Sequence, residues 1–131
     1  MPGKKVLIVD DEEITRVFVA GILADEGWET VEAEDGEEAV QYAALEVPDL
    51  VITDIMMPLK DGFETFYELR SNPKTEHIPI IVLTSVNDFE LGAKHTAESM
   101  GEEYDVPAPE AFVEKPIDGD VLRAAVLEAT S

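Results

Sequence analysis

Apolar runs alternate with segments of helical period along the whole chain. The apolar runs are short and rich in β-branched residues, which is typical of buried strands. In the segments that follow them, apolar residues recur every three or four positions, which is typical of helices. We expect strands at residues 5–9, 30–33, 49–53, 78–84 and 111–115. We expect helices at residues 12–26, 36–45, 62–70, 88–100 and 119–129.

The first helical segment shows this spacing clearly. Its apolar and small residues lie three or four positions apart, as on one side of a helix: Ile14, Val17, Phe18, Gly21 and Ile22. Gly27 is placed to end the helix, because glycine is common just after the last helical turn.

The alternation of strand and helix, repeated five times, predicts an α/β fold. Strands that are apolar throughout are buried on both faces, so we expect a parallel sheet with helices on both sides. The commoner order of such a five-stranded sheet is 2-1-3-4-5, the flavodoxin-like arrangement. The 131 residues fit a single domain, 1–131, and contain no low-complexity tract or interdomain linker.

Composition excludes several kinds of site. Cysteine is absent, so the chain has no disulfide, no thiolate metal site and no thiol nucleophile. The start, "MPGKK", leads directly into the first strand and leaves no room for a signal peptide. The longest apolar runs are far shorter than the roughly 20 residues that cross a bilayer. We therefore expect a soluble, cytoplasmic protein.

Acidic residues dominate the charge: 30 Asp and Glu against 9 Lys and Arg give a formal net charge of −21. Nucleic-acid binding by counterion release needs clustered basic residues, and no stretch supplies them, so we expect no nucleic-acid partner. Anionic membrane surfaces are disfavoured for the same reason. The acidity itself fits two interpretations, which are solubility and attraction to a basic partner surface.

Chemically active residues follow several of the predicted strands. Asp10 and Asp11 follow the first strand, Asp54 the third, Thr84 the fourth, and Lys115 ends the fifth. In doubly wound sheets, ligands bind beyond the carboxyl ends of the strands, at the point where strand order reverses. If the first and third strands are neighbours, the three carboxylates meet in one pocket and face a hydroxyl and an ammonium.

Carboxylates gathered in this way would raise each other's pKa or recruit a cation. Two unit charges about 4 Å apart repel by roughly 4 kcal/mol at an effective dielectric near 20. A few oxygen ligands favour Mg²⁺ over Ca²⁺ or a softer metal. We expect Asp10 and Asp11 to hold the ion, while Glu12 and Glu13 open a helix, where acids suit the dipole. A single acid at a strand end would more simply be a turn or a helix cap.

Four motifs, in this order, resemble the receiver domain of two-component response regulators: "VLIVDDE", "DIMMPLKDG", "IIVLTS" and "FVEKP". The resemblance covers the whole chain. It implies that Asp54 is the phosphoacceptor and receives a phosphoryl group from a histidine kinase or phosphotransfer protein. It also implies a magnesium site formed by the side chains of Asp10, Asp11 and Asp54 and the backbone carbonyl of Met56.

The same resemblance assigns the residues that respond to phosphorylation. Thr84 corresponds to the switch hydroxyl, and Lys115 to the lysine that contacts the phosphoryl group, with a cis bond to Pro116. Phe112 takes the place of the aromatic switch residue. We expect the hydroxyl and the aromatic ring to move together when the phosphoryl group arrives.

The leading interpretation is therefore a phosphorylation-dependent signalling switch that catalyses only its own phosphorylation and dephosphorylation and is not otherwise an enzyme. It would act as a stand-alone receiver, a monomer or weak dimer, on an unknown downstream protein. One alternative is a phosphatase with an aspartyl nucleophile. Such phosphatases carry the motif Asp-x-Asp, with the nucleophile, at the end of the first strand, whereas Asp10 and Asp11 are adjacent here. The other alternative is a degenerate scaffold receiver.

One departure from the family pattern is a long acidic loop before the last strand. Thr84 and Lys115 are separated by 30 residues, more than is usual in the family. We expect the loop at 101–110 to place negative charge beside the switch, to disfavour a symmetric dimer and to select a basic partner. The alternative is a solvated insertion without function. The acids concerned are Glu102, Glu103, Asp105 and Glu110.

Overall fold

The computed structural model describes residues 4–54, 62–84 and 109–130. The strands are β1 (Lys5–Val9), β2 (Glu29–Ala33), β3 (Leu50–Asp54), β4 (Ile80–Thr84) and β5 (Ala111–Glu114). The helices are α1 (Glu13–Asp25), α2 (Gly36–Glu46), α3 (Gly62–Ser71) and α6 (Gly119–Thr130). These elements confirm the predicted ones to within two residues at each end. The helix expected at 88–100 lies outside the described residues.

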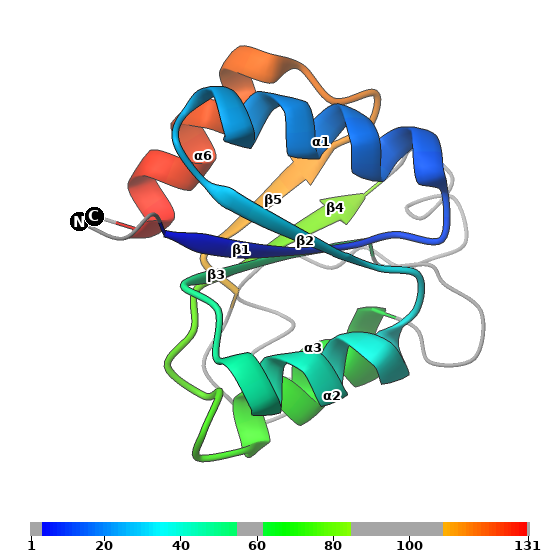
Figure 1. The fold of residues 1–131 in the computed structure, drawn as a ribbon, viewed down its shortest axis with the longest axis vertical. Coiled ribbons are helices and arrows are strands. Elements are labelled where there is room, and N and C mark those ends of the chain that lie inside the picture. The colour runs from blue at the N-terminus through cyan, green and yellow to red at the C-terminus, as the bar shows by residue number, and fades with distance from the viewer. Residues whose placement is uncertain (1–3, 55–61, 85–108, 131) are drawn as a thin grey trace.

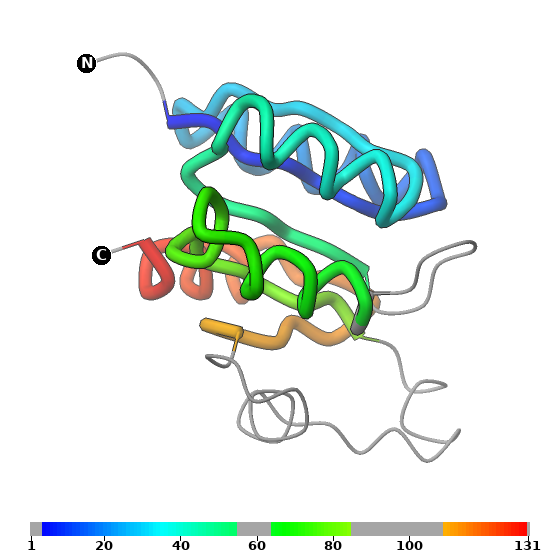
Figure 2. Tube along the Cα trace, turned by 90° about the horizontal axis from the view of Figure 1, so that it is seen from below, coloured from blue at the N-terminus to red at the C-terminus, as the bar shows by residue number. Residues whose placement is uncertain are grey.

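The five strands form one parallel sheet in the order β2-β1-β3-β4-β5, which confirms the predicted topology. Helices α1 and α6 cover one face, and α2 and α3 cover the other (Figure 1). Figure 2 shows α2 and α3 lying side by side under the sheet. Within the described ranges, no helix has the length and apolar character needed to span a bilayer.

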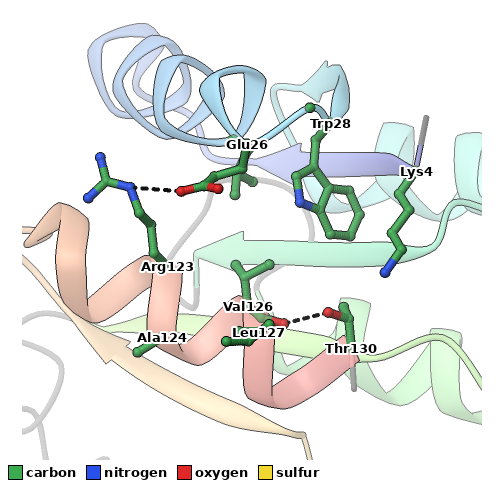
Figure 3. Close-up of a pocket in the computed structure, with 10 residues that line it drawn as sticks. Lys4, Glu26, Trp28, Arg123, Ala124, Val126, Leu127 and Thr130 are labelled. Atoms are coloured by element: carbon green, nitrogen blue, oxygen red, sulfur yellow. Dashed lines mark hydrogen bonds and ion pairs between the residues drawn. The ribbon is translucent and has the colours of Figure 1, made fainter.

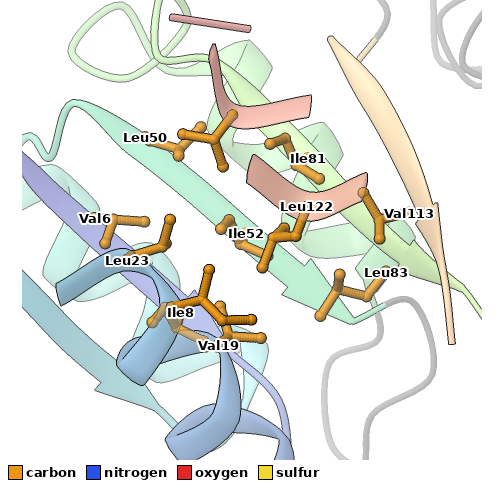
Figure 4. Packing of buried hydrophobic residues seen from close by; sticks show 12 residues of the cluster. Val6, Ile8, Val19, Leu23, Leu50, Ile52, Ile81, Leu83, Val113 and Leu122 are labelled. Atoms are coloured by element: carbon orange, nitrogen blue, oxygen red, sulfur yellow. The ribbon is translucent and has the colours of Figure 1, made fainter. Parts of the chain in front are cut away.

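Two apolar cores lie on opposite faces of the sheet, because successive strand residues point to opposite sides. On β1, Leu7 and Val9 face α2 and α3, while Val6 and Ile8 face α1 and α6. The core beneath α1 and α6 interleaves aliphatic side chains from four strands and both helices (Figure 4). Because helices cover both faces of the sheet, a ligand can reach the sheet only at its edges or at the ends of its strands.

Helix α1 confirms the predicted helix, but of the residues at the predicted apolar spacing only Ile22 is buried. Ile14, Val17 and Phe18 are 85%, 57% and 48% exposed. The buried positions on this helix are Arg16, Val19, Ile22 and Leu23. The helix therefore carries two apolar sides, one against the sheet and one facing solvent.

A buried arginine ties the amino ends of β4 and β5 to α3. Arg70 Nη1 donates to the carbonyl oxygens of Glu76 and Ile78, at 3.2 and 2.6 Å. Its Nη2 donates to Glu110 Oε1 at 2.6 Å, and the same oxygen accepts from the backbone of Ile80. The expectation that Glu110 adds charge beside the switch is therefore wrong, since this carboxylate is paired at the opposite end of the sheet. The other loop acids lie outside the described residues.

Replacing Arg70 with Met should lower the free energy of unfolding by about 3 kcal/mol, because the Glu110 carboxylate and two carbonyls lose their donor. Urea denaturation would measure this loss. The matched control is Arg123→Met, because Arg123 is paired with Glu26 and Asp120 on the surface, where such pairs contribute at most about 1 kcal/mol. Equal losses in the two variants would contradict the role assigned to Arg70.

Candidate functional site

Three charged side chains meet at the carboxyl ends of β1, β3 and β5. Asp10 and Asp54 lie two residues beyond Ile8 and Ile52, which face α1 and α6, so both carboxylates lie toward the same side of the sheet. Lys115 approaches from the end of β5. Its Nζ lies 2.9 Å from Asp10 Oδ2 and 3.4 Å from Asp54 Oδ1. The predicted convergence of these residues is therefore present in the structure.

The ammonium of Lys115 is held between carboxylates that are almost completely buried. Asp10 is 0% and Asp54 5% exposed. Burial by itself would lower the pKa of Lys115, but the hydrogen bond to Asp10 and the charge of Asp54 outweigh it, and the pKa is raised from 10.5. Glu12 lies further out, with Oε1 3.9 Å from the same Nζ. The lysine is thus firmly charged at neutral pH.

Asp10 is fixed by hydrogen bonds from several directions. Its Oδ1 accepts from the backbone of Glu12 at 2.9 Å, and its own backbone N–H donates to the Ala33 carbonyl at 3.2 Å. Its carbonyl accepts from Arg16 Nη1 at 2.7 Å, while Arg16 Nε pairs with Glu32 at 3.0 Å. The strand end that carries the acid therefore cannot turn freely.

The sequence reasoning missed Arg16, although a signal was present. Arg16 lies three residues before Val19 and seven before Leu23, the spacing of the side that packs on the sheet. A charged residue at such a position needs a buried partner. The carbonyl end of β1 supplies one.

Asp10, Asp11 and Glu12 offer carboxylate oxygens that lie within 4.8 Å of one another. Such a group of hard oxygen donors fits a divalent cation that keeps several waters. The predicted ligand set lacks Glu12 and includes Asp54, which is joined to Asp10 through Lys115 in this structure. Met56 lies outside the described residues. Glu12 and Glu13 do open α1, as expected, at its N-cap and in its first turn.

Thr84 stands at the end of β4, where its carbonyl accepts from the backbone of Lys115 at 2.6 Å. Its side-chain hydroxyl has no hydrogen-bond partner in the described part of the chain, although the residue is buried. No fully buried side-chain nitrogen or oxygen there lacks a partner, so this hydroxyl must reach solvent. It is free to turn toward a group that arrives at the site.

Phe112 lies on the same side of the sheet as Thr84. Phe112 pairs with Val82 in the register of β4 and β5, and both pack in the core toward α2 and α3. Thr84 follows Val82 by two residues and so points the same way. The peptide bond between Lys115 and Pro116 is cis, as the resemblance implied.

Comparison with known proteins identifies the family. A family model described as the response regulator receiver domain matches residues 6–127. The chain belongs to this family. Receiver domains of this family are parts of two-component systems.

Relatives and solved structures agree with this. The probable transcriptional regulator ycf27 of Cyanophora paradoxa is 45% identical over 97 residues, covering 69% of this chain and 39% of that protein. A putative response regulator from Chloroflexus aurantiacus J-10-fl has a TM-score of 0.83 at 28% identity, with 98% of each chain covered.

A third comparison shares the fold at lower identity. The receiver domain of the sensor histidine kinase PA1611 from Pseudomonas aeruginosa PAO1 has a TM-score of 0.76 at 21% identity, with 98% of each chain covered. The crystal structure of that domain has a magnesium ion coordinated in its active site cleft. The present receiver domain spans about two fifths of the length of the curated relatives it matches.

The ammonium of Lys115 should titrate above the ordinary lysine value of 10.5, because Asp10 and Asp54 stabilise its charge. The stability that these ion pairs contribute is then fully present below pH 10.5 and is lost as the pH rises through the raised pKa of the folded state. Nitrogen-detected NMR of labelled Lys115, in metal-free buffer, measures the midpoint. Asp54→Asn should lower it, and a midpoint at or below 10.5 in the unaltered protein would refute the arrangement.

Proposed function

We propose that this receiver domain is a phosphorylation-activated switch whose phosphoacceptor is Asp54. The observation that carries the proposal is the placement of Asp54, at the buried end of β3 with Oδ1 3.4 Å from the Lys115 ammonium. The donor is a phosphohistidine on a histidine kinase or phosphotransfer protein. An oxygen of the Asp54 carboxylate bonds to phosphorus, the phosphorus–nitrogen bond breaks, and the imidazole leaves and takes up a proton.

The side chains around Asp54 supply what this transfer needs. A carboxylate that approaches a phosphoryl group meets repulsion between two anions, which positive charge must offset. Lys115 offers a compact charge already directed toward Asp54. Arg16 and the backbone of Glu12 hold Asp10 in place, and Asp10 in turn holds Lys115.

We propose that the acidic group of Asp10, Asp11 and Glu12 forms a Mg²⁺ site together with Asp54 and the backbone carbonyl of Met56. A bound Mg²⁺ neutralises oxygen charge on the phosphoryl group. The donor set, made of carboxylate oxygens with two exposed members, suits this hydrated ion. The magnesium ion in the PA1611 receiver domain supports the same assignment.

The output of the switch is proposed to pass through Thr84 and Phe112. The hydroxyl of Thr84 is free to turn toward the phosphoryl group, and Phe112 is partly buried on the same side of the sheet. Space vacated by one side chain becomes available to the other, so phosphorylation would shift an equilibrium between two packings.

Phosphorylation should be detectable without any partner protein. Incubation with acetyl phosphate and Mg²⁺ should add one phosphoryl group, measured by intact mass, and Asp54→Asn or EDTA should abolish it. Asp25→Asn, which removes an exposed carboxylate from the end of α1, is the matched control and should be labelled normally.

The outcomes separate the alternatives. Stable labelling of Asp54 supports the switch, and continuous release of phosphate without accumulation supports an aspartyl-nucleophile phosphatase. No reaction supports a degenerate scaffold. Labelling of Asp54→Asn to the same extent as the unaltered domain would contradict the assignment of Asp54 as the phosphoacceptor.

The exposed apolar side of α1 is the surface we propose for the phosphodonor. Ile14, Val17 and Phe18 form a solvent-facing stripe that begins one residue after Glu13, where α1 leaves the acidic group. Apolar side chains exposed together on a helix mark interaction surfaces. A partner seated on this stripe would have its reactive histidine beside Asp54.

Phe18→Ala should slow phosphotransfer from the cognate kinase by about tenfold or more, as expected for loss of an anchoring aromatic side chain. Labelling by acetyl phosphate should not change, because the variant leaves the acidic site intact. Leu45→Ala is the control, since Leu45 is also an exposed apolar residue but lies on α2, on the other face. Equal effects of the two variants on phosphotransfer would remove the stripe from the interface.

We also propose that the domain acts as a single unit, 1–131, through protein contacts and not through nucleic acid. The formal net charge of −21 opposes any approach to a phosphate backbone. The name of the ycf27 relative refers to transcription, but the match covers only 39% of that protein.

A further inference from the structure

A pocket lies at the opposite end of the sheet from Asp54, between the end of α1, the start of β2 and α6 (Figure 3). Its volume is about 500 Å³, within the range of sites that bind small organic molecules. Leu23, Val126 and Leu127 form an apolar wall, and the indole of Trp28 forms another. Trp28 is the one tryptophan of the chain.

Two polar groups in this pocket, the ammonium of Lys4 and the indole N–H of Trp28, are hydrogen-bond donors. The ammonium of Lys4 lies 5.7 Å from the centre of the Trp28 ring, and no carboxylate pairs with it among the described residues. The indole N–H of Trp28 likewise has no acceptor in residues 4–54, 62–84 and 109–130. No fully buried side-chain nitrogen is unpaired there, so this N–H is open to solvent or to a ligand.

Lys4 has this in common with Lys74, which likewise pairs with no carboxylate in the described part of the chain, but Lys74 lies outside the pocket. The other cation of the pocket, Arg123, is paired: its Nε lies 3.3 Å from Glu26 and its Nη1 2.9 Å from Asp120. The pocket therefore combines apolar walls with the Lys4 ammonium, which contacts the Trp28 ring but no described carboxylate, and an indole N–H without a described acceptor.

We propose that this pocket binds a small aromatic acid. The aromatic body would pack on Trp28 and Leu127, and its single carboxylate would accept from the Lys4 ammonium and the indole N–H. A neutral aromatic molecule could use the walls but would leave both donors unpaired, which favours the acid. A larger polyanion is disfavoured, because the chain carries a formal net charge of −21.

The inference is independent of the phosphorylation chemistry. The pocket lies at the amino ends of the strands, because Lys4 precedes β1 and Trp28 precedes β2. Asp10 and Asp54 lie at the carboxyl ends. Acetyl phosphate labelling of Asp54 should therefore be the same in every pocket variant.

Two dyes with the same rings test the proposal. 8-Anilinonaphthalene-1-sulfonate carries one anionic group, and N-phenyl-1-naphthylamine carries none. Excitation of Trp28 at physiological ionic strength should show saturable energy transfer to the anionic dye, with one dye bound per chain. 1-Naphthaleneacetate, an aromatic carboxylate, should displace it.

Lys4→Gln should weaken binding of the anionic dye by about fivefold and leave the neutral dye unchanged, as expected for loss of a single partly exposed charge contact. Lys74→Gln, an exposed lysine outside the pocket, is the matched control and should change neither. Leu127→Asp should abolish binding of both dyes, since it removes the apolar wall and adds a negative charge.

Three results would overturn the proposal. They are the absence of saturable energy transfer from Trp28, equal affinity for the two dyes, and an equal response to Lys4→Gln and Lys74→Gln. Far-ultraviolet circular dichroism on each variant excludes unfolding as the cause of any loss. Because all the substituted residues are exposed, the variants are expected to fold normally.

Discussion

The contact of one ammonium with two buried carboxylates is the constraint on which the site depends. Asp10 is fully buried and Asp54 almost so, and each would lose stability as an anion if it had no cation beside it. Lys115 meets that need only because β1, β3 and β5 end at the same edge of a parallel sheet. A different strand order would separate these side chains and leave buried charges unpaired, so fold and site chemistry require each other.

Much of this was predictable from sequence, and the misses have a common physical origin. Strands apolar throughout predict a parallel sheet, and parallel strands bring their carboxyl ends together, so the meeting of Asp10, Asp54 and Lys115 follows from local pattern. A local pattern does not predict which side of a helix packs on the sheet when both sides are apolar, as on α1. Arg16 and Glu110 also depend on tertiary partners. Glu110 pairs with groups 30 and 40 residues away, whereas the position of Arg16 on the packed side of α1 was a signal in the sequence.

Charge is distributed unequally between the two ends of the sheet. At the carboxyl end, acids gather around Lys115, which suits the metal ion and the phosphoryl group that we propose for this site. At the amino end, Lys4 and Arg123 border a cavity with apolar walls. The formal net charge of −21 disfavours anions in general, so an unpaired cation such as Lys4 is needed to attract one.

Helix α1 joins three parts of the proposed mechanism in one rigid element. Its first turn carries Glu13 next to the acidic group, and its buried side carries Arg16, which holds the carbonyl of Asp10. Its exposed side carries the stripe with Phe18. A partner that packs on the stripe therefore contacts the same helix that fixes the position of Asp10. Since helices move as units more readily than they bend, docking and acid placement are mechanically linked, which would let a cognate partner align the site that it phosphorylates.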